Sequence, residues 1–380
     1  MGAKVCFHTL GCKVNQYETG RMAQSLRARG YDIVNSDDPA DIYVINSCTV
    51  TQIADRKTRN YVRRSKRQNP HAITALVGCF AEMSPDVAAG MPEADIILGT
   101  GEKDKLADAI DEVIRSRGLR VALAEPPVTA VKARDRAWLK IGDGCDRFCS
   151  YCIVPYARGP VRSRPQDEII AEARELALDG YKEIVLTGIN IALYGTDMTG
   201  NTGGGHDMPG RPLLDLIDRL SGIHGDFKIG LGSLEPNVVN AEFVRELIKR
   251  DKLTHELHLS LQSGSNRILK AMGRRYTLEE YMEIIDVLRE SDTKWSVTTD
   301  IIAGFPGETE EDFMASVDAV KRIGFSHVHV FRFSARKGTP AHGMANKVVE
   351  SRIRSRAIYL IKTAGEIAGE SIKGFSGTAD

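Results

Sequence analysis

Residues 144–164, GCDRFCSYCIVPYARGPVRSR, hold three of the seven cysteines of the chain. Cys145, Cys149 and Cys152 are spaced C-x-x-x-C-x-x-C on a glycine-flanked loop, directly after the strand-type run WLKIG. A structural zinc site generally has four protein ligands, so zinc would need a distant residue to complete its coordination here. Three thiolates suit a cubane iron–sulfur cluster better, because they leave one iron open to an exogenous ligand.

The composition is that of a globular protein without a membrane segment. The 380 residues suffice for two domains with separate cores, and 42% of them are hydrophobic and 27% charged. The chain lacks an apolar run of membrane-spanning length and a signal peptide, which predicts a cytoplasmic protein with no membrane contact. The formal net charge is zero, so a nucleic-acid partner would have to be bound by a local basic patch. An odd number of cysteines in a reducing compartment favours metal binding or catalysis over disulfides.

Short apolar runs typical of strands alternate with helical patterns, which predicts the α/β class with parallel sheets. Four such runs, KVCFHTL, DIYVIN, AITALVG and DIILG, predict a flavodoxin-like parallel-sheet domain over residues 1–118. Residues 119–136 lack periodicity and are predicted to form a linker. Residues 137–345 carry six further strand-type runs, which predict a partial (βα)6 TIM-like barrel. Residues 346–380 are predicted to form a C-terminal helix and tail.

Three more cysteines each follow a predicted strand of the first domain. Cys12, Cys48 and Cys79 come at or just after the ends of three of its strand-type runs. The carboxyl ends of parallel strands meet at one edge of a sheet, which is where open α/β sheets bind ligands. Three thiolates without a fourth again predict a cluster with one open iron. The alternative is that these are buried apolar cysteines, as Cys6 inside the first run is expected to be.

The motif Cys145-x-x-x-Cys149-x-Tyr151-Cys152 resembles that of radical S-adenosylmethionine (SAM) enzymes. The resemblance implies that the cluster cysteines are catalytic, that the open iron binds SAM, and that reduction cleaves SAM to a hydrogen-abstracting 5′-deoxyadenosyl radical. It also implies that Tyr151 lies beside the adenine of SAM. The glycine-rich strand ends LTGIN, LGSLEP and TTDIIAGFPGET stand where the family contacts the rest of SAM. The further SAM contacts so implied are Thr187, Gly188, Asn190, Ser233, Glu235 and Gly304.

A chain with two three-cysteine sites resembles the methylthiotransferase family of radical-SAM enzymes, over residues 4 to about 370. The runs TLGCKVNQYET (9–19) and INSCTVTQIADRKTR (45–59) are most similar to the branch that acts on threonylcarbamoyladenosine in tRNA. The resemblance implies conversion of N6-threonylcarbamoyladenosine at position 37, next to the anticodon, to its 2-methylthio derivative. Cys12, Cys48 and Cys79 would hold the auxiliary [4Fe-4S] cluster, and Cys145, Cys149 and Cys152 the SAM-binding [4Fe-4S] cluster.

The same resemblance implies the partners of the protein. They are the anticodon stem-loop of tRNA and an external electron donor such as flavodoxin or ferredoxin, and the protein is expected to be a monomer. The stretch RKTRNYVRRSKR (56–67) carries seven Lys or Arg in twelve residues on a predicted helix just after Cys48. A solvated helix face is the alternative, but the position favours RNA contact, with Arg158, Arg162 and Arg164 after the other cluster adding to it. The predicted RNA-binding residues are Arg56, Lys57, Arg63, Arg64, Lys66 and Arg67.

Several other functions remain open. The family usually ends in a small RNA-binding module called TRAM, for which this sequence is too short. A methylthiotransferase acting on an aspartate of a ribosomal protein is one alternative, and one acting on isopentenyladenosine in tRNA is another. The residues after Cys12, which are Lys13, Val14 and Asn15, differ from the Pro-Lys-Asn and Gln-Met-Asn expected of those branches. An iron–sulfur electron carrier and a radical-SAM enzyme of other chemistry are the remaining alternatives.

Overall fold

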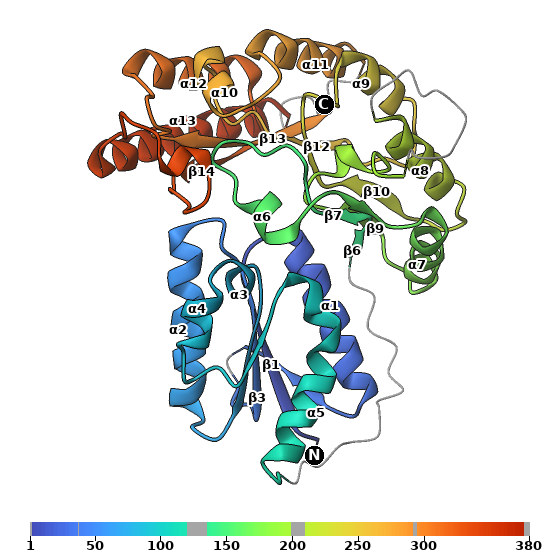
Figure 1. Cartoon of the computed structure of the whole chain (residues 1–380). Helices are drawn as coiled ribbons and strands as arrows, with labels where there is room; N and C mark the ends of the chain where they lie inside the picture. Colours follow the sequence, from blue (N-terminus) through green and yellow to red (C-terminus); the bar gives the residue numbers. More distant parts are fainter. Residues whose placement is uncertain (1, 37, 120–134, 199–209, 292–294, 376–380) are drawn as a thin grey trace. The chain divides into compact units, whose positions relative to one another are not determined.

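The computed structural model describes residues 2–36, 38–119, 135–198, 210–291 and 295–375, with side chains up to residue 369. The chain divides into two compact units (Figure 1). One is Met1–Lys132 together with Ile153–Gly159, and the other is Ala133–Cys152 together with Pro160–Asp380. Among the described residues, no helix combines the length and the apolar character needed to cross a membrane.

The N-terminal unit is built on a five-stranded parallel sheet with the order β2-β1-β3-β4-β5. This is the strand order of flavodoxin-like folds and confirms the predicted class. The short edge strand β2 was missed from the sequence, because it has only three residues and none of them is buried. The elements are β1 (Lys4–Thr9), α1 (Lys13–Ala28), β2 (Asp32–Val34), β3 (Ile42–Ser47), α2 (Gln52–Gln68), β4 (Ile73–Gly78), α3 (Cys79–Met83), α4 (Pro85–Ala89), β5 (Ile96–Leu98), η1 (Thr100–Lys105), α5 (Leu106–Ser116) and α6 (Val154–Arg158).

Helices cover both faces of this sheet, so its central strands are apolar on both sides. In β3, Val44 packs in one core with residues of α1 and α5, and Ile45 packs in the other core with residues of α2 and α3. Burial of both faces explains why β3 and β4 read as continuous apolar runs rather than alternating ones. Cys6 is fully buried in the core under α2, as expected for a structural cysteine.

The second unit is a partial barrel whose strands are all parallel apart from a small hairpin of β7 and β8. Its sheet has the orders β10-β9-β6 and β11-β12-β13-β14, and only Gly232 separates β10 from β11 in the chain. The six predicted strands are thus all present, and the predicted partial barrel is confirmed. The elements are β6 (Arg136–Lys140), β7 (Gly142–Asp143), β8 (Arg162–Ser163), α7 (Gln166–Leu178), β9 (Glu183–Thr187), η2 (Ile191–Leu193), α8 (Arg211–Ser221), β10 (Lys228–Leu231), β11 (Ser233–Leu234), α9 (Ala241–Leu247), β12 (Glu256–Leu259), α10 (Asn266–Ala271), α11 (Leu278–Ser291), β13 (Ser296–Ala303), α12 (Glu310–Ile323), β14 (His327–Arg332), η3 (Pro340–His342) and α13 (Glu350–Phe375).

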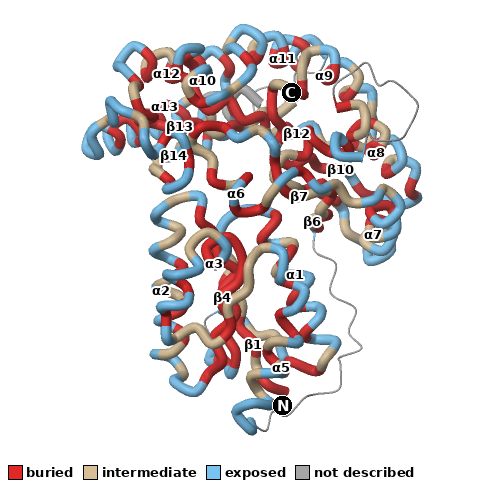
Figure 2. Tube along the Cα trace, in the orientation of Figure 1, coloured by how far each residue is buried: buried red, intermediate tan, exposed pale blue. Residues whose placement is uncertain are grey.

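The strands of this unit carry their apolar side chains on the face that the helices cover. Leu257, Leu259, Ile301 and Val328 belong to one large buried core with residues of the surrounding helices (Figure 2). Because strand side chains alternate between faces, the residues between them point to the inner face of the partial barrel. That inner face carries polar side chains on β12, β13 and β14.

One segment packs outside the domain in which the sequence places it. Residues 153–159 fall inside the predicted range 137–345, but they pack with the N-terminal unit. The reason is Arg158, a buried residue whose guanidinium pairs with Glu18 of α1 at 3.0 Å. Residues 120–134 of the predicted linker lie outside the described residues, and the remaining domain boundaries stay predictions.

A buried ion pair anchors the long helix α13 on the loop that follows β13. Arg356 donates to the Glu308 carboxylate at 2.7 Å, and their side chains are only 3% and 1% exposed. The backbone N–H of Gly304 donates to the same carboxylate at 2.8 Å. These two donors therefore stabilise the charge of the buried Glu308 carboxylate.

We expect Arg356→Leu to lower the free energy of unfolding by about 3–5 kcal/mol, because it leaves a buried carboxylate without its cation. The double variant Glu308→Gln/Arg356→Leu should recover part of that loss. Urea unfolding followed by circular dichroism measures both. Lys362→Leu, which removes an exposed ion pair on the same helix, is the matched control and should change stability by less than about 1 kcal/mol. An Arg356→Leu variant no less stable than this control would contradict the assignment.

Candidate functional site

The three cysteines of the N-terminal unit lie at the carboxyl ends of adjacent strands. Cys48 follows β3 directly, Cys79 is the first residue of α3 after β4, and Cys12 is the N-cap of α1, three residues past β1. Strands β1, β3 and β4 are neighbours and end at the same level, because their register pairs Thr9 with Asn46 and Ser47 with Gly78. The parallel sheet thus places the three cysteines at a single edge.

Glycine makes the close approach of the Cys12 loop to Cys48 possible. Gly11 has φ = +94°, and a Cβ added there would lie 2.7 Å from the Cβ and 2.9 Å from the Sγ of Cys48. A side chain at position 11 would therefore be both strained and in collision with a candidate ligand. Gly78, which precedes Cys79, also has a positive φ, +95°, and its missing Cβ makes room for the Lys103 side chain.

The two buried thiols of this trio, Cys48 and Cys79, do not ionise easily without a cation beside them. Burial, together with the neighbouring thiols of Cys79 and Cys12, raises the pKa of Cys48 to about 12. Burial also raises the pKa of Cys79, while Arg158 and Lys103 lower it. Iron ions favour the thiolate form strongly, so this donor set, three clustered cysteines at one edge, fits an iron–sulfur cluster.

A buried network of charges lies beside Cys79. The carboxylate of Glu18 in α1 forms ion pairs with Lys103 Nζ at 2.5 Å and with Arg158 Nη1 at 3.0 Å. Arg158 also donates to the side-chain oxygen of Asn15 at 2.6 Å. Two cations thus share one carboxylate, which leaves a net positive charge next to the thiols. A thiolate-ligated cluster is negatively charged, and this network suits it.

The second trio lies on the loop after β7 and is held by α10 and the turn that follows it. Cys145 and Cys149 are buried and Cys152 is half-buried. The Ser150 backbone N–H donates to the carbonyl of Met272 at 2.8 Å, and its hydroxyl donates to the carbonyl of Ala271 at 2.9 Å. Burial raises the pKa of the Cys145 thiol to about 11 and also raises the pKa of Cys149, so these two thiols also need a cation to ionise.

Two of the predicted SAM contacts are in direct contact with one another. The Glu235 carboxylate accepts hydrogen bonds from Asn190 Nδ2 and Arg147 Nε, both at 2.8 Å, and from Arg274 at 3.5 Å. The side-chain oxygen of Asn190 is buried and has no hydrogen-bond partner among the described residues. A buried acceptor without a donor is costly, and the methionine amino group of SAM is a donor of the kind that would satisfy it.

The remaining predicted SAM contacts stand at strand ends of the same unit. Tyr151 accepts a hydrogen bond from Arg274 at 2.6 Å, so its hydroxyl is already engaged. Gly304 has φ = +82°, and a Cβ there would lie 2.4 Å from Ile353, so packing against α13 alone requires glycine. The others stand at the ends of β9 and the start of β11, and they are Thr187, Gly188 and Ser233. All of these roles stay predictions. Arg147 and Arg274 were missed, because their contact with Glu235 depends on the fold rather than on spacing.

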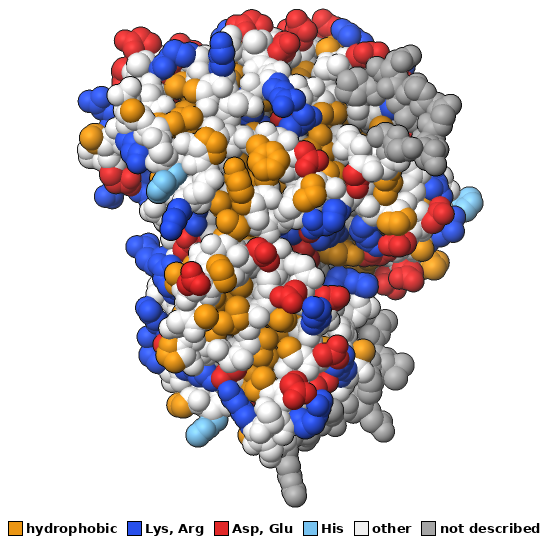
Figure 3. All heavy atoms as spheres, viewed as in Figure 1, with side chains coloured by type: hydrophobic (Ala, Val, Ile, Leu, Met, Phe, Trp, Pro, Cys, Tyr) orange, Lys and Arg blue, Asp and Glu red, His pale blue; other side chains and the backbone are white. Residues whose placement is uncertain are grey.

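The basic stretch forms helix α2, and most of its charges are exposed. Figure 3 shows Lys and Arg side chains gathered along the left edge of the N-terminal unit, where α2 lies in Figure 1. Lys66 differs from the other predicted RNA contacts, since it donates to Asp95 at 2.7 Å and to the Ala72 carbonyl at 2.6 Å. Arg158 is buried and pairs with Glu18, which contradicts the expectation that it contacts RNA. The RNA contact of Lys66 stays a prediction. The exposed candidates are Arg56, Lys57, Arg63, Arg64 and Arg67.

Comparison with known proteins identifies the family. Residues 139–320 match the radical SAM superfamily, and residues 4–99 match the uncharacterized protein family UPF0004. The threonylcarbamoyladenosine tRNA methylthiotransferase MtaB of Bacillus subtilis is 40% identical over 378 residues, which covers 97% of this chain and 82% of that relative. This chain belongs to the tRNA methylthiotransferase family of radical SAM proteins.

Other family members match over a similar length. The MtaB protein of Thermotoga maritima is 39% identical over 96% of this chain and 82% of its own. A tRNA-2-methylthio-N(6)-dimethylallyladenosine synthase of Thermoanaerobacter is 34% identical over 97% of this chain and 80% of its own. Among solved structures, the radical SAM methyltransferase TsrM from Kitasatospora setae has a TM-score of 0.58 and 14% identity, with 90% of this chain and 77% of that chain covered. The predicted membership and fold class are confirmed.

We expect Arg158→Met to weaken the hold of the auxiliary cysteines on iron, because it removes one of the two cations beside Cys79. Iron bound at that site should pass to a chelator several-fold faster than in the unaltered protein, followed by the absorbance of the chelate. Arg162→Met, which removes an exposed arginine of β8, is the matched control. Equal rates of iron loss in the two variants would contradict a role for the buried charge network.

Proposed function

We propose that this protein is a methylthiotransferase that converts N6-threonylcarbamoyladenosine at position 37 of tRNA, next to the anticodon, to its 2-methylthio derivative. The observation that carries the proposal is the pair of three-cysteine sites, one at the carboxyl ends of three parallel strands of the first unit and the other on a single loop of the second unit. The similarity to relatives named for this reaction supports it over the full length of the chain.

The reaction replaces the hydrogen on C2 of adenine by a methylthio group. That hydrogen is not acidic, so none of the ionisable side chains of the chain could remove it as a proton. Two [4Fe-4S] clusters and SAM, when bound, supply the radical chemistry, the sulfur and the methyl group. Cys145, Cys149 and Cys152 would hold the SAM-binding cluster. The auxiliary cluster would be held by Cys12 and the cysteines that follow β3 and β4.

The side chains around the second trio have the task of orienting SAM. Glu235 fixes Asn190 from one side, so the free oxygen of Asn190 is held in one place to accept a hydrogen bond. Arg147 and Arg274 form ion pairs with the buried carboxylate of Glu235 and compensate its charge. A rigid acceptor of this kind positions a ligand before reaction instead of during it.

The partners follow from the reaction. The substrate would be the anticodon stem-loop of tRNA, and the electrons would come from an external donor such as flavodoxin or ferredoxin. The protein would act as a monomer in the cytoplasm, where tRNA and such electron donors are present. Two related activities compete with the proposal, namely methylthiolation of a dimethylallyladenosine in tRNA, as the name of one relative states for that protein, and of an aspartate in a ribosomal protein.

The proposal is tested by incubating the reconstituted protein without oxygen with SAM, a reductant and a synthetic anticodon stem-loop. Stem-loops that carry threonylcarbamoyladenosine or dimethylallyladenosine, and a ribosomal-protein preparation, are compared as substrates. The proposal predicts a mass increase of one methylthio group for one hydrogen on the first stem-loop. Modification of another substrate instead would contradict it.

The two cysteine trios should separate the two halves of the reaction. Replacing Cys12, Cys48 and Cys79 together by Ala should remove roughly half of the iron and abolish methylthiolation, while SAM is still cleaved to 5′-deoxyadenosine. Replacing Cys145, Cys149 and Cys152 should abolish that cleavage and leave the other iron in place. Iron analysis and chromatography of 5′-deoxyadenosine measure both, and Cys6→Ala is the control. Loss of SAM cleavage in the first variant would show that the trios do not have separate roles.

Helix α2 should contribute to tRNA affinity through its exposed charges. We expect Arg63→Glu/Arg64→Glu to weaken tRNA binding by about tenfold or more and to reduce its salt dependence, since phosphate contacts release counterions. Filter binding at several salt concentrations measures both effects. Arg174→Glu/Lys321→Glu, which changes the net charge equally on exposed positions of α7 and α12, is the matched control. An equal loss in the control would mean that only net charge matters.

A further inference from the structure

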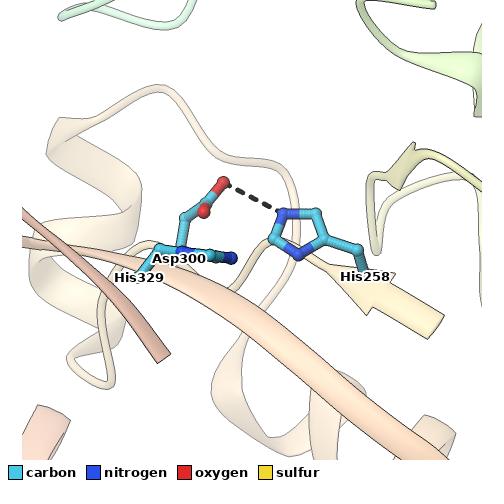
Figure 4. Close-up of side chains that lie close together, drawn as sticks. All are labelled: His258, Asp300 and His329. Atoms are coloured by element: carbon cyan, nitrogen blue, oxygen red, sulfur yellow. Dashed lines mark hydrogen bonds and ion pairs between the residues drawn. The ribbon is translucent and has the colours of Figure 1, made fainter. Parts of the chain in front are cut away.

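A cluster of ionisable side chains stands on the inner face of the partial barrel, on three adjacent strands. His258 lies on β12, Asp300 on β13 and His329 on β14 (Figure 4). The parallel register pairs Asp300 directly with His329, and it pairs His258 with Thr298, two residues before Asp300. One ligand atom from each of the three side chains lies within 4.8 Å of the others.

The groups in this cluster are oriented by hydrogen bonds. His258 Nε2 lies 3.2 Å from Asp300 Oδ2, and its Nδ1 lies 2.9 Å from the Thr298 hydroxyl. The hydroxyl of Ser260 donates to the same Asp300 oxygen at 3.2 Å. Burial raises the pKa of Asp300, but the hydrogen bond and charge of His258, with help from His329 and Ser260, outweigh it and hold the pKa below its ordinary value. Asp300 is thus a carboxylate at neutral pH.

The fold itself does not need these charges. The apolar core of this sheet lies on the other face, where Leu257, Leu259 and Ile301 pack against the helices. The side chain of Asp300 is 23% exposed and His329 is exposed, so the cluster is open on the side away from the core. An open group of oriented donors and acceptors in the middle of a sheet is the usual make-up of a ligand-binding surface.

A continuous chain of contacts joins this cluster to the loop of the second cysteine trio. Arg274, which donates to the Tyr151 hydroxyl, lies with its guanidinium 5.9 Å from the ring centre of Tyr276. The buried Tyr276 hydroxyl in turn donates to the carbonyl of Ser260 at 2.9 Å. Ser260 is the residue that donates to Asp300. Packed residues of the same unit therefore connect the cluster to Tyr151, the residue before Cys152.

We propose that Asp300, held in place by His258, and His329 bind the polar substituent on N6 of the target adenine, and thereby select a threonylcarbamoyl group over an apolar dimethylallyl group. This inference rests on the proposed function. A threonylcarbamoyl group carries urea N–H donors, for which Asp300 is an acceptor. It also carries carbonyl and carboxylate oxygens, to which the imidazole of His329 donates. Both ring nitrogens of His258 are engaged with Thr298 and Asp300, so His258 holds the Asp300 carboxylate in place.

The selectivity follows from the cost of unpaired polar groups. A site built to hydrogen-bond its substrate rejects an analogue that lacks those groups strongly, because its own donors and acceptors are then left without partners. The dimethylallyl group offers no hydrogen bonds and would displace water from Asp300 without replacing it. The polar inner face thus favours the threonylcarbamoyl group named for one relative and disfavours the dimethylallyl group named for another.

The test compares Asp300→Asn and His329→Ala with the unaltered reconstituted protein on three anticodon stem-loops, carrying threonylcarbamoyladenosine, dimethylallyladenosine or unmodified adenosine at position 37. We expect the preference in kcat/KM for threonylcarbamoyladenosine over unmodified adenosine to fall about 10- to 100-fold in each variant, the range of one charge-assisted hydrogen bond. Iron content and SAM cleavage without RNA should stay unchanged. His224→Ala, at an exposed position between α8 and β10, is the control.

The outcomes are distinct. Variants that keep the full preference for threonylcarbamoyladenosine would overturn the inference and leave the proposed function intact. An unaltered protein that modifies none of the three stem-loops, or only the dimethylallyl one, would overturn both. Zinc or iron bound beyond that of the two clusters, and lost in His329→Ala, would make the cluster a metal site and would also overturn the inference.

Discussion

The ionisation of buried thiols is the constraint on which the rest of this structure depends. Two cysteines of each trio are buried, and burial raises the pKa of Cys48 to about 12 and that of Cys145 to about 11. Thiols in such surroundings become thiolates only when a cation is bound between them. The protein therefore positions the thiols and places positive charge near them, and the iron ions of the family's clusters stabilise the thiolate form. In the first unit, parallel strands provide that geometry, because their carboxyl ends bring distant cysteines to one edge, whereas a single loop provides it in the second unit.

Each trio lies near a buried carboxylate that two cations share. Beside Cys79 these cations are Lys103 and Arg158 on Glu18, and in the second unit they are Arg147 and Arg274 on Glu235. The second network differs because Asn190 also binds Glu235 and keeps a buried oxygen that has no hydrogen-bond partner among the described residues. That acceptor suits a small ligand held in a fixed orientation. This difference agrees with an auxiliary cluster in one unit and a SAM-binding cluster in the other.

Local pattern was enough to predict the sheets, the six barrel strands and the strand-end cysteines, because each depends on residues close in sequence. What the sequence could not provide depends on register and packing. Arg158 follows the second trio in sequence but packs beside the first, and Lys66 lies in the basic stretch but pairs with Asp95. Likewise, His258 and Asp300 are 42 residues apart and meet only because β12 and β13 pair in one particular register.

Nucleoside mass spectrometry of tRNA would decide whether this chain modifies threonylcarbamoyladenosine, in cells that lack their own threonylcarbamoyladenosine methylthiotransferase and are compared with and without the gene for this chain. We expect 2-methylthio-N6-threonylcarbamoyladenosine to appear only when the gene is present. A gene with Cys145, Cys149 and Cys152 replaced by Ala should not restore it. If only the unmodified precursor is found while the protein is present and loaded with iron, the assignment of this tRNA substrate is contradicted.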